Sequence, residues 1–303
     1  MADMRVTIAG VEFANPIVAA SGTFGFGREY MEFYPLSTLG GISCKGITLK
    51  ERAGNPPPRI AETPSGMLNA VGLQNPGVDY FIKYDLPWLK TQGTKIIANI
   101  AGNTPEEYCE MAEKLSDTDV DMIELNISCP NVKQGGVQFG TSCAGVGGIT
   151  AAVRKHCKKP LMVKLSPNVA DIGEIAQAAE EAGADALSMI NTLTGMRIDI
   201  RTHRPIIRNN TGGLSGPAIL PVAVRMIWQA ASRVKIPIVG MGGISKWEDA
   251  VELMLAGASA LQVGTAFFSN PYAPVEILKG LEDYLDENKM ASVAELTGKV
   301  QAW

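Results

Sequence analysis

The segment NISCPN at 126–131 brings one thiol and two flanking side-chain amides together. Cys129 ends a predicted strand, is fixed by Pro130, and is followed by the glycine-containing stretch VKQGGVQFGTS at 132–142. A thiol under a loop that can move is suited to act as a base or a nucleophile. The alternative is a buried structural cysteine. We expect that structural role for the remaining cysteines: Cys44, Cys109, Cys143 and Cys157.

Polar residues recur where predicted strands end. They are Lys45, Asn99, Asn126, Lys164 and Asn191. Lysine is almost never fully buried without a partner, and five polar residues at equivalent places are hard to assign to a core role. Barrel enzymes build their sites at the C-terminal ends of their strands, so we expect these residues to line one site.

Glycines follow the last two predicted strands, in GMGGIS at 240–245 and GTA at 264–266. The loops after strands seven and eight form the usual phosphate site of barrel enzymes, where backbone N–H groups can approach an anion. Either loop alone could be only a tight turn. Together they favour a cofactor that carries a phosphate.

Another glycine-rich segment, GTFGFG at 22–27, does not have the spacing of a dinucleotide fingerprint, and we reject that interpretation. We expect instead that Ala20, Ser21 and Gly22 let a flat ring system lie against the backbone.

Eight short apolar runs must position these residues. They span 16–20, 41–45, 95–99, 122–127, 160–165, 186–190, 237–239 and 260–263. Helical periodicity over 172–182 and 247–255 is followed by Gly183 and Gly257, where a helix should end. Apolar strands that alternate with helices predict a parallel sheet, and eight of them predict a (β/α)8 barrel. A doubly wound sheet is the alternative.

We expect a single domain over residues 1–303, since no linker divides the chain. The alternation at 4–13 predicts a hairpin that plugs the bottom of the barrel. Long connections at 46–94 and 191–217 would be inserted on the C-terminal face, where function usually lies. The second contains RIDIRTHRPIIR at 197–208, which we interpret as a solvated hairpin.

The composition excludes several classes of protein. A net charge of -4, without any block of like charge, argues against nucleic acid as a partner. The sequence shows neither a membrane span nor a signal peptide, so we expect a cytoplasmic protein. Five widely spaced cysteines and two histidines predict neither a disulfide framework nor a metal or iron–sulfur site on this chain.

The motifs together resemble the class 1 dihydroorotate dehydrogenases. The resemblance rests, in order along the chain, on KGIT (45–48), NAVGLQNPG (69–77), NISCPN, VKLSP (163–167), INT (190–192), GGLSGPA (212–218), GMGGI and GTA. Cysteine as the base marks class 1, since the membrane-bound class 2 enzymes use serine. The stretches NTLTGMRIDI and GGLSGPAI resemble the NAD-linked subclass 1B more than the fumarate-using subclass 1A.

This resemblance implies a role for each site residue. Cys129 would take a proton from C5 of (S)-dihydroorotate while a hydride passes from C6 to FMN, giving orotate for pyrimidine (UMP) biosynthesis. The implied substrate-binding residues are Lys45, Asn69, Val71, Gly72, Leu73, Asn126, Asn131, Asn191 and Thr192. The implied FMN-binding residues are Ala20, Ser21, Gly22, Lys45, Asn99, Asn126, Lys164, Ile190, Gly216, Gly242, Gly243, Gly264 and Thr265.

The resemblance also implies a partner. The chain has no nicotinamide fingerprint and no cysteine cluster, so NAD reduction would need an electron-transfer subunit with FAD and [2Fe–2S], in a heterotetramer of two subunits of each kind. Three alternatives remain open. They are a subclass 1A enzyme, a dihydropyrimidine dehydrogenase subunit that reduces uracil or thymine, and a non-enzymatic barrel that binds a phosphate ligand.

Overall fold

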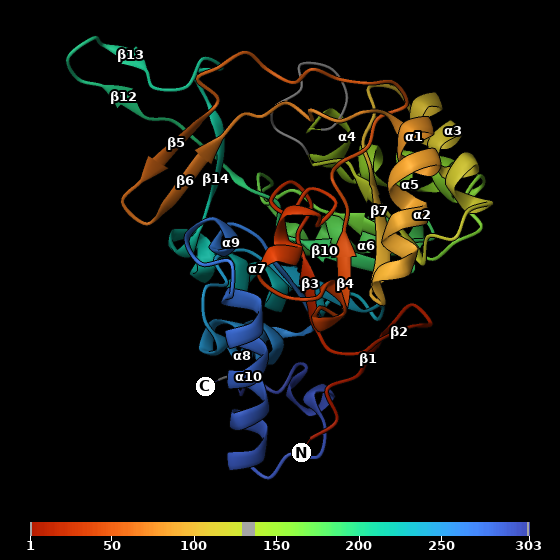
Figure 1. Cartoon of the computed structure of the whole chain (residues 1–303), viewed down its shortest axis with the longest axis vertical. Coiled ribbons are helices and arrows are strands. Elements are labelled where there is room, and N and C mark those ends of the chain that lie inside the picture. The colour runs from red at the N-terminus through yellow and green to blue at the C-terminus, as the bar shows by residue number, and fades with distance from the viewer. Residues whose placement is uncertain (1, 129–136, 302) are drawn as a thin grey trace.

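Eight parallel strands close into a barrel in the computed structural model, which describes residues 2–128, 137–301 and 303 (Figure 1). The barrel strands are β3 (Ile17–Ala19), β4 (Gly41–Ser43), β7 (Lys95–Ile100), β8 (Met122–Asn126), β9 (Leu161–Lys164), β10 (Ala186–Met189), β15 (Ile238–Met241) and β16 (Ala258–Val263). Each predicted apolar run overlaps one of these strands. The (β/α)8 barrel is confirmed, and a doubly wound sheet is excluded because the sheet closes on itself.

Helices cover the outside of the barrel, which explains why its strands are mostly apolar. The long ones are α3 (Pro105–Ser116), α5 (Cys143–Arg154), α6 (Ile172–Glu181), α7 (Leu220–Ala231), α8 (Trp247–Ala256) and α10 (Ala273–Glu287). The predicted helices over 172–182 and 247–255 are α6 and α8. Gly183 (φ +98°) and Gly257 (φ +131°) end them with backbone angles that side chains disfavour. In the described part of the chain, no helix combines the length and apolarity needed to cross a bilayer.

The first two connections depart from the regular pattern. Between β3 and β4 the chain forms only two short 3-10 helices, η1 (Glu29–Glu32) and η2 (Leu36–Thr38). Between β4 and β7 it forms α1 (Val78–Tyr80), a π-helical turn η3 (Phe81–Asp85), α2 (Leu86–Leu89) and the 3-10 turn η4 (Lys90–Gln92). Helical structure therefore covers this side of the barrel in shorter pieces.

Two strands extend two residues beyond their predicted apolar runs. The strand β15 continues through Gly240 to Met241, and β16 begins at Ala258. A Cβ added at Gly240 would lie 2.8 Å from the Cβ of Ala258, so the glycine allows the two strands to approach closely. Gly240 therefore belongs to β15, whereas the glycines of the segment 240–245 had suggested a tight turn.

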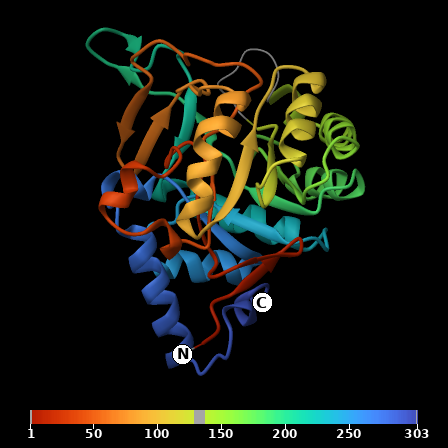
Figure 2. The ribbon, with the colours of Figure 1, turned by 45° about the vertical axis from the view of Figure 1, so that its right-hand side comes forward.

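The predicted N-terminal hairpin consists of β1 (Val6–Ile8) and β2 (Val11–Phe13), which pair antiparallel. Phe13 is only 1% exposed, and its ring lies against Gly41, the first residue of β4. The hairpin therefore packs under the N-terminal end of the barrel. Both chain termini lie at this end of the molecule, away from the inserted strands (Figure 2).

The two long insertions meet in one sheet at the opposite end. A four-stranded antiparallel sheet has the order β11 (Leu193–Gly195), β14 (Gly212–Ser215), β6 (Gly66–Asn69) and β5 (Ile60–Thr63). The strands β5 and β6 come from the first insertion and the others from the second. A separate hairpin, β12 (Ile198–Asp199) and β13 (Arg204–Pro205), projects beyond this sheet (Figure 1).

Candidate active site

A cavity of about 790 Å³ opens where the barrel strands end and the inserted sheet begins. It is lined by most of the residues that the sequence singled out. These are Ala20, Ser21, Gly22, Lys45, Asn69, Val71, Gly72, Leu73, Asn126, Lys164, Ile190, Asn191, Thr192, Gly216, Gly242, Gly243, Gly264 and Thr265. Residues from the ends of the barrel strands and from both insertions thus converge on one site.

A buried carboxylate lies beneath this cavity, inside the barrel. Glu124 on β8 is fully buried and accepts hydrogen bonds from four other strands. The donors are Ser43 Oγ at 2.6 Å, Ser188 Oγ at 2.7 Å, Gln262 Nε2 at 2.8 Å, and the side-chain amide of Asn99. Barrel interiors are usually filled by branched apolar side chains, so this polar layer serves some purpose other than packing.

Lys164 supplies the positive charge that balances Glu124. Its side chain is on β9 and lines the cavity, although the residue is only 4% exposed. Burial alone would raise the pKa of Glu124, but the Lys164 cation and the hydrogen bonds from Ser43, Ser188 and Asn99 outweigh burial and lower that pKa. Glu124 is therefore ionised, and the floor of the cavity carries a charge of each sign.

A chain of hydrogen bonds leads from Glu124 up to the cavity. Asn99 donates to Glu124, and its Oδ1 accepts from Asn126 Nδ2 at 3.3 Å. Asn126 Oδ1 accepts from the backbone N–H of Ser128 at 3.3 Å and from its hydroxyl at 3.1 Å. Ser128 Oγ accepts from Asn191 Nδ2 at 2.6 Å. Two amides that line the cavity are thus connected to the buried carboxylate.

Asn69 and residues 71–73 form part of the cavity wall, and Asn75 lies just behind them. Asn75, which is 5% exposed, donates to the carbonyl of Leu73 at 2.7 Å and to Thr48 Oγ1 at 2.8 Å, while its Oδ1 accepts from Gly77 N at 2.8 Å. Leu73 has φ +57°, a conformation that non-glycine residues adopt at some cost. The Asn75 side chain therefore holds a strained wall in place.

Glycines form another part of the cavity wall. Gly216, Gly242 and Gly243 have φ values of +101°, +123° and +81°. Ser215 and Thr265 join the two sides of this wall through a hydrogen bond between their hydroxyls at 2.8 Å. Backbone N–H groups at such turns can bind an anion, so this wall suits a phosphate.

A family model described as dihydroorotate dehydrogenase matches residues 3–285 of the chain. The chain belongs to the dihydroorotate dehydrogenase family. Its curated relatives include three proteins named "Dihydroorotate dehydrogenase B (NAD(+)), catalytic subunit". The one from Alkaliphilus oremlandii is 57% identical over 98% of this chain and 99% of its own length. Those from Petrotoga mobilis and Bacteroides thetaiotaomicron are 54% and 53% identical, over 98% and 99% of this chain and 99% and 100% of their own lengths.

Membership of the dihydroorotate dehydrogenase family implies a flavin, and four features of the cavity fit FMN. A Cβ at Gly22 (φ +92°) would meet nothing within 4 Å, which leaves open space for a flat ring. Gln262 Oε1 is buried at the cavity without a hydrogen-bond partner among the described residues. The glycine wall would take the phosphate, and Lys164 would lie among the groups that face the ring.

Two predicted site residues, Cys129 and Asn131, lie outside the described residues. A third, Asn99, is fully buried and is not among the residues that line the cavity. Its side chain is hydrogen-bonded to Glu124 and Asn126. In this dehydrogenase fold, Asn99 therefore supports the residues that form the site.

The other cysteines differ from one another. Cys44 and Cys157 are buried as expected, and burial raises the pKa of both thiols. Cys143 is exposed and Cys109 is half-buried, so the expectation of four buried structural cysteines is wrong for these two. Cys143 is the first residue of α5, and it is exposed. The sequence around it did not indicate whether this cysteine would be buried or exposed.

The sequence did not single out the hairpin formed by β5 and β6 or the Gln262 side chain. Residues 62–67 of this hairpin contribute to the cavity lining, apart from Pro64, and Gly66 packs so closely on Ser215 that no Cβ would fit. Gln262 immediately precedes VGTA near the end of β16 and is flanked by Leu261 and Val263. The rule that polar residues at strand ends mark the site could have found Gln262, but nothing local predicted the hairpin contact.

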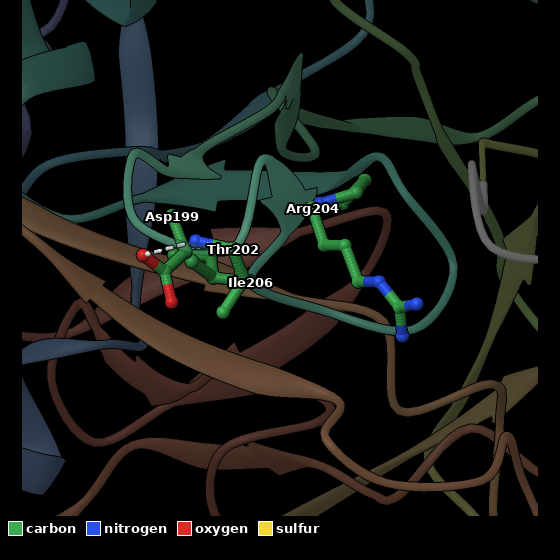
Figure 3. A pocket seen from close by; sticks show the side chains of 5 residues that line it. Asp199, Thr202, Arg204 and Ile206 are labelled. Carbon is green, nitrogen blue, oxygen red and sulfur yellow. Dashed lines mark hydrogen bonds between the residues drawn. The ribbon is translucent and has the colours of Figure 1, made fainter.

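A smaller hollow lies in the β12–β13 hairpin and is lined by Asp199, Thr202, Arg204, Pro205 and Ile206 (Figure 3). Asp199 Oδ1 accepts from the Thr202 backbone N–H at 3.4 Å within this turn. The side chain of Ile200 is 84% exposed at the tip. Residues 197–204 therefore form a solvated hairpin, as the charge pattern indicated, whereas Ile207 is fully buried against Leu68 and Ala70.

Replacing Gly243 with alanine should weaken FMN binding. A Cβ there would lie 2.6 Å from the backbone nitrogen of Leu220, so the loop must shift. We expect the Kd for FMN, measured by fluorescence titration of the apoprotein, to rise about tenfold, since a tenfold change needs only about 1.4 kcal/mol. Gly10→Ala is the matched control, because Gly10 has φ +82° and open space around it. An equal rise of the Kd for FMN in both variants would contradict the idea that the close contact with Leu220 causes the effect.

Proposed function

We propose that this chain is the catalytic subunit of an NAD-linked dihydroorotate dehydrogenase. It would oxidise (S)-dihydroorotate to orotate in de novo pyrimidine (UMP) biosynthesis, with FMN as its cofactor. The observation that carries this proposal is the single cavity that joins a glycine wall, Lys164 and the amides of Asn126 and Asn191. The names of relatives that match the full chain support the same activity.

The amides suit a pyrimidine substrate. Each asparagine offers a donor and an acceptor, which match the carbonyl and N–H groups of a neutral ring. Asn69, Asn126, Asn191 and Thr192 line the cavity and would hold the ring together with Asn131. The carboxylate of orotate needs a cation or several donors, and Lys45 lies at the same cavity. A uracil-reducing enzyme would not need that charge.

Bound FMN would supply the acceptor for the hydride from C6 of the substrate. Lys164 would offset the negative charge that reduction places on the flavin, and its electrostatic attraction to Glu124 lowers the pKa of that carboxyl. Lys45 would face both flavin and substrate, while Ala20, Ser21, Gly22 and Ile190 would contact the ring. The side chains that close over the cavity from β5 and β6 would limit access of water.

Cys129 would act as the base that removes the C5 proton, a role that follows from the NISCPN motif. The preceding residue, Ser128, is fully buried and is hydrogen-bonded to both Asn126 and Asn191. That anchoring supports the proposal, because it fixes where the segment with the thiol begins.

Electrons would leave through a separate subunit. The relatives are named catalytic subunits, which supports a partner. We propose that the partner carries FAD and [2Fe–2S] and that two subunits of each kind form a cytoplasmic heterotetramer. The described cysteines are free thiols, which fits a reducing compartment.

The test is to purify the chain alone and together with its partner subunit. We expect a yellow protein that releases FMN and, alone, reduces an artificial dye with dihydroorotate; with the partner it should reduce NAD. Rapid turnover with fumarate in place of NAD would support subclass 1A instead. Turnover of dihydrouracil but not dihydroorotate would indicate a dihydropyrimidine dehydrogenase, and a protein without flavin would contradict the proposal.

A further inference from the structure

The carboxylate of Glu124 determines which end of each neighbouring amide points at it. An ionised carboxylate can only accept hydrogen bonds, whereas a side-chain amide has one donating and one accepting end. Asn99 and Gln262 both contact Glu124, so each must turn its NH₂ group toward that residue. Their carbonyl oxygens are therefore directed away from Glu124.

This constraint passes along the chain of hydrogen bonds. The Asn99 oxygen can only accept, so Asn126 must present its NH₂ group to it, at 3.3 Å. The Asn126 oxygen then faces Ser128, whose hydroxyl donates to it at 3.1 Å. With its proton committed, Ser128 Oγ accepts from Asn191 Nδ2 at 2.6 Å. Each amide therefore has only one orientation that is compatible with the ionised carboxylate of Glu124.

The same constraint acts on Gln262. Its Nε2 donates to Glu124 at 2.8 Å, which leaves Oε1 as the atom that can face the cavity. Gln262 is only 1% exposed, and its Oε1 has no hydrogen-bond partner among the described residues. A buried acceptor without a partner is costly unless a ligand donates to it. A ring N–H group of a bound flavin has the required chemistry.

We propose that Glu124 is a positioning residue that fixes the donor and acceptor orientation of Asn126, Asn191 and Gln262 toward orotate and FMN. The inference rests on the proposed function, since orotate and FMN are the ligands. Glu124 itself touches neither ligand; it acts through Asn99 on one side and through Gln262 on the other. The same carboxylate balances Lys164, so orientation and charge must be separated by experiment.

The first test is Glu124→Gln, which keeps the shape but introduces an NH₂ group. That group must face either Asn99 or Gln262, so the side-chain amide of one of these two residues must turn its oxygen toward position 124. The donors and acceptors that this residue orients at the cavity would then be exchanged. We expect the Kd of orotate or of FMN to rise about tenfold or more, because a reversed amide leaves polar atoms unpaired. Orotate is titrated by the absorbance change of the FMN-loaded protein, and FMN by fluorescence with the apoprotein. Glu113→Gln, on the exposed face of α3, is the matched control and should change neither Kd.

The double variant Asn99→Asp with Glu124→Gln tests orientation directly. The aspartate introduced at position 99 would accept from both the glutamine amide introduced by the second substitution and Asn126, so every amide nearer the cavity could keep its native orientation. We expect it to recover affinities to within about threefold of wild type, a difference under about 1 kcal/mol. A double variant that binds as poorly as Glu124→Gln would overturn the proposal.

Asn99→Ser separates orientation from charge. It breaks the connection to Asn126 but retains both Glu124 and Lys164, and it also serves if Glu124→Gln does not fold. Weaker orotate binding with unchanged FMN content supports the proposal, and orotate binding within about twofold of wild type overturns it. Wild-type protein that binds neither FMN nor orotate would instead mean that the proposed function is wrong.

Discussion

Cys129→Ala should retain FMN and lose dihydroorotate oxidation by about 10²- to 10⁴-fold, the usual contribution of a positioned base. Alanine would remove the proposed base for the C5 proton, whereas the described residues that line the cavity would keep their side chains. The measurements are kcat with an artificial dye and FMN content from the absorbance spectrum. Orotate affinity should change little, since the amides and Lys45 that we propose to hold the substrate are unchanged.

Two substitutions make this result specific. Cys143→Ala removes an exposed free cysteine that does not line the cavity, and we expect full activity. Cys129→Ser keeps a small polar group with a much higher pKa than a thiol, so it should recover activity only at high pH. Near-normal turnover by Cys129→Ala would exclude this residue as the base.

Much of the barrel could be predicted because its signals are local. Eight apolar runs became eight strands, and the glycines after 172–182 and 247–255 end α6 and α8. Polar residues at the strand ends could be assigned to one face, because parallel strands of a barrel all end on the same face. Lys45, Asn126, Lys164 and Asn191 therefore converge as expected.

The parts that escaped prediction depend on contacts between distant segments. Glu124 is one polar residue within an apolar strand, and only the closed barrel brings Ser43, Ser188 and Gln262 to it. The four-stranded sheet pairs residues 67–69 with residues 213–215, which are separated by most of the barrel. Asn99 lies near the end of its strand, as predicted, but its side chain contacts Glu124. A position at a strand end does not determine whether a side chain points into the cavity or into the barrel beneath it.

Lys164→Met should impair both stability and catalysis. The substitution leaves the buried Glu124 carboxylate without the cation that lowers its pKa, and an uncompensated buried charge can cost up to about 3–5 kcal/mol. It also removes a positive charge that would stabilise the reduced flavin, so we expect turnover to fall about 10²- to 10³-fold. Urea unfolding and FMN titration measure the two effects. Lys158→Met, at an exposed pair with Asp117, is the control and should change neither by much.

The pH dependence identifies Glu124 as the cause of the lost stability. In the wild type the pKa of Glu124 is below its ordinary value of 4.5, so the stability it contributes is present above that pH and is lost as pH falls through the folded-state pKa. Without Lys164 the pKa of Glu124 rises. Once this folded-state pKa is above 4.5, the ionised carboxylate destabilises the folded protein instead of stabilising it. The stability deficit of Lys164→Met should then be largest at neutral pH and shrink as pH falls toward 4.5.

A second substitution separates the two roles of Lys164. Adding Glu124→Gln to Lys164→Met removes the uncompensated charge, so most of the lost stability should return. Catalysis should not return, because the reduced flavin would still lack the cation that we propose for it and the amides would lack the charge that we propose to orient them. A deficit that is independent of pH and survives the second substitution would mean that Lys164 stabilises the barrel through packing of its aliphatic chain.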